Sequence, residues 1–221
     1  MVSGKGKSSW SRDETSRETG RIERAGKGTR RERKSRPLDE VSLRDLALSY
    51  VARFATTGAK LEQYLARKIR ERGVAEDEDG RTRDLDVTGI VTRFIELGYI
   101  DDDAYARGRS RDLTARGYGA RRVEQALWAA GVEEQVRSDN APGEAESRRA
   151  AVLLAKKRRF GPFAIAPEQE PSAEERHKLR EKQVAAMLRA GHLFDHVRFI
   201  MDASSQDEIE QWIEESDDYA D

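Results

Sequence analysis

Apolar residues between about residues 40 and 202 recur at intervals of three and four, the spacing of one face of an α-helix. The strict alternation of apolar and polar residues that is typical of half-buried strands is hard to find. A start resembling a capping box runs from Ser42 to Asp45. It introduces an apolar stripe made of Leu43, Leu46, Tyr50, Val51 and Phe54. The pattern predicts an all-α fold.

Glycines and capping residues divide this pattern into groups of three helices. Thr57 begins a second helix that ends at Gly73, and a third helix ends at Gly98. A new group begins at Asp101, whose run of three aspartates complements the helix dipole. Later helices begin after Gly119, near residue 144, at a Ser172/Glu175 capping box and near Leu193, and the breaks between them are residues 139–143 and 164–171.

Three of the helix ends resemble one another. They close on Gly73, Gly131 and Gly191, which lie 58 and 60 residues apart. Such a period favours internal duplication, although glycine ends helices in many unrelated proteins and chance is the alternative. Duplication predicts tandem three-helix repeats stacked into an elongated, curved array, because one trio of short helices is too small to bury its own apolar faces.

This interpretation divides the chain into five segments. We expect a disordered basic tail (1–38), helical repeats 1, 2 and 3 (39–100, 101–143 and 144–203) and an acidic C-terminal extension (204–221). From Met1 to Arg36 there are twelve Lys and Arg against five Asp and Glu, and from Asp202 to Asp221 there are nine acidic residues and no basic one. Both ends are either interaction arms or solvated termini. Around Trp212 the pattern predicts a short amphipathic helix that either docks on the body or stays mobile.

Composition limits the classes of protein that fit. Charged residues make up 38% and hydrophobic residues 37% of the 221 residues, so the core is thin for the length. The absence of cysteine suits a reducing cytoplasm and excludes disulfides and zinc–thiolate sites. No segment has the length of a membrane helix, and the first thirty residues are not a secretory signal. We therefore expect a cytoplasmic protein without a membrane partner.

Motifs for catalysis or cofactor binding are weak. Gly6-Lys7-Ser8 lacks the earlier glycine and the preceding strand of a phosphate-binding loop. His192 and His196 have the i, i+4 spacing at which two histidines on one helix can bind a metal. Because no third ligand lies nearby in the sequence, we expect instead that the two side chains are packed or lie on the surface. No serine, histidine and carboxylate lie at spacings that suggest a triad. We expect no enzyme activity, no cofactor and no metal.

Basic residues instead gather in each repeat. Aligned along one curved surface, three such clusters would meet phosphates or an acidic protein groove. Tyr118 and Trp128 would stack on bases if single strands bind. The alternative is that these charges are only solvated helix faces. The candidate binding residues are Arg67, Lys68 and Arg70 in repeat 1, Arg107, Arg109, Arg111, Arg116, Tyr118, Arg121 and Arg122 in repeat 2, and Lys156, Lys157, Arg158 and Arg159 in repeat 3.

Three segments resemble the RecX family of bacterial recombination regulators. The run from Phe94 to Ala106 matches the family's LGxxDDxxxA core, and the run from Arg116 to Leu127 matches its RGYGxxRIxxxL segment. The run from Leu188 to Val197 is similar to the C-terminal LxRRGFxxDxV pattern, with Ala190 where an arginine is usual. The resemblance covers residues 43–201, which is most of the part of the chain expected to be ordered. The insert at residues 76–83 and the loop at residues 164–171 depart from the family pattern.

The resemblance implies tandem three-helix repeats and binding to RecA, especially to RecA filaments on single-stranded DNA. It implies a mostly negative regulator that limits strand exchange, ATP hydrolysis and cleavage of the LexA repressor. DNA is a second expected partner, and we expect an elongated monomer. The alternative is a general nucleic-acid-binding helical protein without a specific RecA partner.

Overall fold

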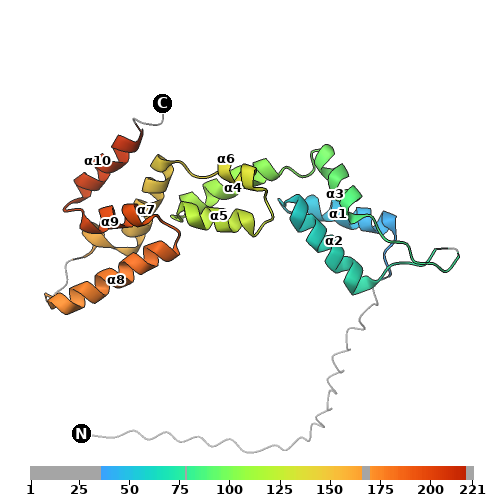
Figure 1. The fold of residues 1–221 in the computed structure, drawn as a ribbon, viewed down its shortest axis with the longest axis horizontal. Helices are drawn as coiled ribbons and strands as arrows, with labels where there is room; N and C mark the ends of the chain where they lie inside the picture. The colour runs from blue at the N-terminus through green and yellow to red at the C-terminus, as the bar shows by residue number, and fades with distance from the viewer. Residues whose placement is uncertain (1–35, 78, 166–169, 218–221) are drawn as a thin grey trace, which may run out of the picture. The chain divides into compact units, whose positions relative to one another are not determined.

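The computed structural model describes residues 36–77, 79–165 and 170–217, so most of the expected basic tail lies outside the described residues. Within them the secondary structure is helical, with two isolated β-bridges (Figure 1). This confirms the predicted all-α fold. The helices are α1 (Glu40–Val51), α2 (Gly58–Arg72), α3 (Val87–Glu96), α4 (Asp102–Ala115), α5 (Ala120–Trp128), α6 (Glu134–Asp139), α7 (Glu144–Arg158), the 3-10 helix η1 (Gly161–Phe163), α8 (Ala173–Arg189), α9 (Phe194–Asp202) and α10 (Gln206–Asp217).

Side-chain caps fix where several helices begin. The Oγ of Thr57 accepts from the Lys60 amide, and Ser172 and Glu175 form the predicted reciprocal capping box. The first helix begins earlier than expected. Asp39 is its N-cap and Ser42 is the reciprocal partner within the first turn, because the Asp39 carboxylate accepts from the Ser42 amide at 2.7 Å. The predicted start at Ser42 was therefore wrong by one turn.

Three glycines at helix ends have the positive φ that glycine tolerates best. The φ angle is 77° at Gly73, 73° at Gly131 and 93° at Gly191. These are the second helices of successive trios, α2, α5 and α8. The three equivalent ends are consistent with internal duplication, which remains a prediction.

Buried apolar side chains form three clusters along the chain. The first gathers side chains from α1, α2 and α3, the second from α4 and α5, and the third from α7, α8, α9 and α10. Ile209 and Trp212 of the acidic extension are 1% and 9% exposed in the third cluster, so α10 is docked. The repeat boundaries at residues 100/101 and 143/144 remain predictions.

Equivalent helix ends meet at the two junctions between successive trios. At the first junction, the Oγ of Thr57, the N-cap of α2, donates to the Ala130 carbonyl at 2.5 Å. At the second, the Gly119 amide donates to the Ala190 carbonyl at 3.0 Å. In both, the start of one trio's second helix meets the end of the next trio's second helix. The contact repeats with nearly the sequence period of the stop glycines.

The second junction brings two backbones too close for a side chain. A Cβ atom on Gly119 would lie 2.4 Å from the carbonyl carbon and oxygen of Gly191. The Arg121 amide also donates to the Gly191 carbonyl at 3.1 Å. Glycine is therefore required at position 119 by the close approach of the two chain segments.

The chain's own entry segment covers the free end of α2. Leu38 is fully buried, its amide donates to the Gly73 carbonyl at 2.9 Å, and its carbonyl accepts from the Ala75 amide at 2.8 Å. Leu38 was expected to end the tail. Its amide bonds the carbonyl of Gly73, the stop glycine of α2, in the same way that the Arg121 amide of the second trio bonds the carbonyl of Gly191, the stop glycine of α8.

Candidate functional site

Side chains from the second and third trios line a groove of about 370 Å³. Four of them are cations and two are aromatic, and the lining includes no carboxylate: Arg116, Lys157, Arg158, Arg189, Tyr118 and Phe160. We call this feature the basic groove. Cations gathered around a concave surface attract anions, phosphate groups in particular.

Two chain reversals position the side chains of the basic groove. Arg116 ends α4, and Gly117 with φ of 89° turns the chain so that the Tyr118 amide donates back to the Leu113 carbonyl at 3.1 Å. Arg159 ends α7 in the left-handed region at φ 58°. The ammonium of Lys157 then donates to the Arg116 carbonyl at 3.3 Å, which ties the two helix ends together.

The cations of the basic groove differ in whether they contact other side chains. The guanidinium of Arg116 lies 3.6 Å from Asp112 and 5.9 Å from the centre of the Tyr118 ring. Arg158 and Arg189 are exposed and make no ion pair within the described residues. Exposed cations without a carboxylate partner are the ones that gain most from an incoming anion.

A buried histidine lies beneath the same junction. His192 is 1% exposed, and its Nε2 lies 3.1 Å from the Gly117 carbonyl oxygen. Burial lowers the pKa of His192 to about 4, against the opposing effect of the Gly117 hydrogen bond, so the ring is neutral near pH 7. Because a carbonyl can only accept, we assign the proton to Nε2. Nδ1 has no hydrogen-bond partner within the described residues.

The structure brings together only part of the predicted site. Arg116, Tyr118, Lys157 and Arg158 line the basic groove. The other repeat 2 candidates do not: Arg107 pairs with Asp103, Arg109 lies 3.5 Å from Asp112, and Arg111, Arg121 and Arg122 are exposed elsewhere.

Candidates in the outer trios have other partners. Lys68 of α2 contacts Glu71 at 2.6 Å, and this hydrogen bond lowers the pKa of the Glu71 carboxyl. Arg67 lies 3.7 Å from the same carboxylate, and Arg70 is exposed. Lys156 of α7 lies 3.8 Å from Glu210 of α10, while Arg159 is exposed beyond the end of α7. None of these five residues lines the basic groove.

Sequence reasoning missed Arg189. It lies in the last turn of α8, two residues before the stop glycine at position 191. The repeated helix end could have pointed to Arg189, because the end of α8 meets the turn that carries Arg116. Of the two aromatic residues expected to stack on bases, Tyr118 lines the groove, whereas Trp128 is 70% exposed on α5 outside it.

The histidine pair does not converge on one point. His192 faces the Gly117 carbonyl, whereas the Nε2 of His196 lies 3.1 Å from Glu144. Among the described residues no three or more His, Cys, Asp or Glu side chains are grouped as metal ligands. None of the helices described is long and apolar enough to span a bilayer. Anion binding is the chemistry that the basic groove best supports.

Comparison with known proteins finds similarity to RecX proteins. No family model matches the chain. It is 30% identical over 182 residues to "Regulatory protein RecX" of Myxococcus xanthus, covering 80% of this chain and 92% of that protein. The crystal structure of RecX from Lactobacillus salivarius matches with a TM-score of 0.52 at 18% identity, over 79% of this chain and 96% of that one. A further RecX crystal structure has a TM-score of 0.48 at 17% identity, over 74% and 72%.

Proposed function

The chain belongs to the RecX family, and from this membership and the basic groove we propose that it regulates RecA. In this proposal it binds RecA filaments on single-stranded DNA in the cytoplasm. It limits recombinase activity, ATP hydrolysis and the co-protease activity of RecA. The protein acts by binding and not by catalysis.

The observation that carries the proposal is the basic groove between the second and third trios. Four cations and two aromatic side chains meet there from three segments, the outer two of which are 73 positions apart in sequence. Lys157 and Arg116 are tied by a hydrogen bond, so part of the positive surface is held in place before a partner binds. A rigid surface loses less conformational entropy on binding, which favours affinity.

The stacking of the trios suggests how such a surface is used. The hydrogen bonds from the Thr57 hydroxyl and from the Gly119 amide hold consecutive trios in register. We propose an elongated, curved monomer that lies in the helical groove of the filament and touches neighbouring RecA protomers. The exposed basic residues outside the groove add weaker contacts that depend on salt.

A charge-reversal experiment tests this function. RecA is assembled on single-stranded DNA with ATP, and hydrolysis is measured against increasing concentrations of the chain or of the Arg158→Glu/Arg189→Glu variant. The wild type is expected to slow hydrolysis, and the variant to require at least about tenfold more protein, as two charge-assisted contacts are lost.

Lys182→Glu is the matched control. It removes an exposed cation from the same helix as Arg189, two turns away and outside the groove. This control is expected to inhibit like the wild type. If saturating wild-type protein leaves both hydrolysis and filament length unchanged, the RecA proposal fails.

General binding to nucleic acid is the second candidate, and the exposed Trp128 beside a basic helix face favours it. It predicts tight binding to DNA alone with a steep dependence on salt. Parallel titrations of bare single-stranded DNA and of the RecA filament separate the two functions. Preference for the filament supports the RecA regulator, and equal affinity supports the general binder.

A further inference from the structure

The position directly after each stop glycine is equivalent in the three trios. The residues at this position are Val74, Val132 and His192. Val132 and His192 have the same backbone contact, because the amide of each donates to the carbonyl five residues earlier, Leu127 at 3.2 Å and Met187 at 3.3 Å. Val132 is 2% exposed and His192 is 1% exposed. A buried valine at the equivalent position shows that packing alone does not require a histidine there.

The histidine is less favourable in one respect than a valine. Nδ1 of His192 has no hydrogen-bond partner within the described residues. Burial of a polar atom without a partner is unfavourable, and an apolar side chain would avoid that loss of hydration. What the imidazole adds at this position is therefore the hydrogen bond that Nε2 donates to the Gly117 carbonyl, at 3.1 Å.

This carbonyl belongs to the peptide unit that joins Gly117 to Tyr118. The N–H of the same unit is the Tyr118 amide, which donates to the Leu113 carbonyl of α4 at 3.1 Å. Because a peptide unit is planar, hydrogen bonds at both of its ends restrict its orientation and the path of the chain into Tyr118. One of the two bonds comes from the second trio, and the other comes from His192 of the third.

The preceding peptide unit is held in the same way, but by an exposed side chain. The Gly117 amide donates to the Thr114 carbonyl at 2.9 Å, and the Arg116 carbonyl accepts from the ammonium of Lys157 at 3.3 Å. Lys157 is an exposed cation of the basic groove, so a bound phosphate competes with the Arg116 carbonyl for its N–H groups. Buried His192 does not meet this competition. It therefore holds the turn in place while an anion binds.

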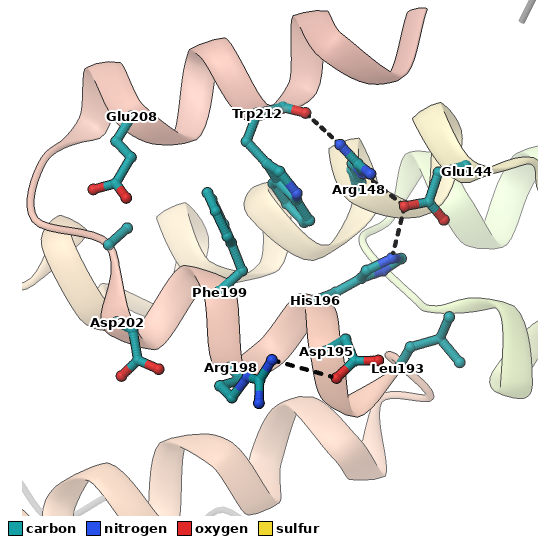
Figure 2. Close-up of a pocket in the computed structure, with 11 residues that line it drawn as sticks. Glu144, Arg148, Leu193, Asp195, His196, Arg198, Phe199, Asp202, Glu208 and Trp212 are labelled. Carbon is teal, nitrogen blue, oxygen red and sulfur yellow. Dashed lines mark hydrogen bonds and ion pairs between the residues drawn. The ribbon is translucent and has the colours of Figure 1, made fainter. Parts of the chain in front are cut away.

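His196, four residues further along the chain, has different neighbours. Figure 2 shows its ring directed at Glu144 of α7, and Nε2 lies 3.1 Å from that carboxylate. The ring centre also lies 5.5 Å from that of Trp212 in α10. These contacts join α9 to α7 and α10. Of these two buried histidines, only His192 contacts the turn of the second trio.

We propose that His192 is a positioning residue of the basic groove. By holding the Gly117 carbonyl, it places the flanking residues Arg116 and Tyr118, which line the groove, for contact with single-stranded DNA. The His192 side chain does not itself line the groove, so it acts through this turn. The inference rests on the proposed function in one respect, the binding of DNA phosphates in the basic groove.

Replacement by the residue of the equivalent position tests the proposal in the full chain. Binding of a fluorescein-labelled single-stranded oligonucleotide is measured by fluorescence anisotropy over a salt series. His192→Val is expected to weaken binding about threefold to tenfold, as one hydrogen bond that positions the groove is lost. The slope of the logarithm of affinity against the logarithm of salt concentration should shrink by about 0.7, the contribution of one phosphate on a single strand.

His192→Gln is the rescue variant, because its side-chain amide can still donate to the Gly117 carbonyl. It should restore most of the affinity and of the slope. The slope does not depend on how much of the sample is folded, so a variant that is merely destabilised would keep the wild-type slope. His192→Met, with a larger apolar side chain, is measured beside His192→Val and replaces it if circular dichroism shows that the valine variant is unfolded.

A double-mutant cycle with Arg116→Gln tests whether His192 acts through the turn. In the Arg116→Gln background, His192→Val should no longer change the slope and should weaken binding by a smaller factor than in the wild type. His177→Val removes an exposed histidine of α8 outside the groove and should bind like the wild type.

Two results with the variants overturn the proposal. One is wild-type affinity and slope in the folded apolar variant, and the other is equal weakening by valine and glutamine, which would assign the effect to packing. Failure of the wild type to bind the oligonucleotide would also overturn it. The RecA function is decided separately, by the hydrolysis assay on filaments.

Discussion

At residue scale, the close approach at Gly119 predicts a large effect from one methyl group. Gly119→Ala places Cβ 2.4 Å from backbone atoms of Gly191, which cannot move aside as a flexible side chain can. We expect the variant to lower the free energy of unfolding by about 1–3 kcal/mol, the usual cost of overpacking. Urea unfolding followed by circular dichroism measures the change.

Gly108→Ala is the matched control for this substitution. Gly108 lies within α4, and a Cβ atom there would have no neighbour within 4 Å. Alanine in a helix interior is favoured over glycine by about 1 kcal/mol, so this variant should be slightly more stable than the wild type. An equal loss of unfolding free energy in both variants would show that the two backbones at Gly119 and Gly191 leave room for a methyl group.

The buried His192 predicts that stability falls on mild acidification. Its folded pKa of about 4 lies below the unfolded value near 6.5, so the unfolded chain binds the proton more readily between these two pH values. The stabilisation that neutral His192 contributes is present above pH 6.5 and is lost as the pH falls towards 4. We expect a loss of about 2 kcal/mol between pH 7.5 and pH 5.

His192→Gln removes the titrating ring while retaining a donor for the Gly117 carbonyl. The variant should be less stable at pH 7.5 but should lose much less further stability by pH 5. Glu144, whose pKa is lowered through Arg148 and His196 against the effect of burial, adds a loss of the same sign only in more acidic solution. A slope that is unchanged in His192→Gln would assign the pH dependence to other groups.

At element scale, the docking of α10 depends on one aromatic side chain. Trp212→Ala removes the stack on Phe199 and the contact with Arg148, and should destabilise the chain by about 3–5 kcal/mol. Glu210→Gln weakens only the exposed pair with Lys156 and should cost less than about 1 kcal/mol. Similar small costs for both changes, measured by urea unfolding, would mean that α10 is held mainly by charge.

The elements themselves were readable from the sequence because their signals are local. Apolar spacing, the caps at Thr57 and Ser172 and the stop glycines each act within a few residues, and the structure contains the helices that they predict. The first helix begins at Glu40 because Asp39 and Ser42 share one cap, which leaves either residue as a plausible start. The position of Trp212 against α7 and α9 depends on tertiary packing. The sequence alone therefore did not decide whether α10 docks.

At the scale of the whole molecule, the basic groove shows what local patterns do not contain. Arg116 and Arg189 line one groove although 73 positions separate them in sequence. The Gly119 amide and the Ala190 carbonyl bring their helix ends together. Basic residues of high local density, such as Arg107 and Arg109, are instead paired with neighbouring aspartates. Density of charge along the chain was therefore a weaker guide than the junctions between trios.

The basic groove also sets the salt dependence of binding to single-stranded DNA. Four cations that each neutralise one phosphate would give a slope of about −3 for the logarithm of affinity against the logarithm of salt concentration. Arg158→Glu/Arg189→Glu removes two of them, so the slope should shrink to about half, while Lys182→Glu on the same helix should leave it unchanged. Fluorescence anisotropy with labelled oligonucleotide over a salt series gives all three slopes. A slope that the double reversal leaves intact would place the phosphate contacts on other helix faces, such as the exposed Arg111 and Arg121.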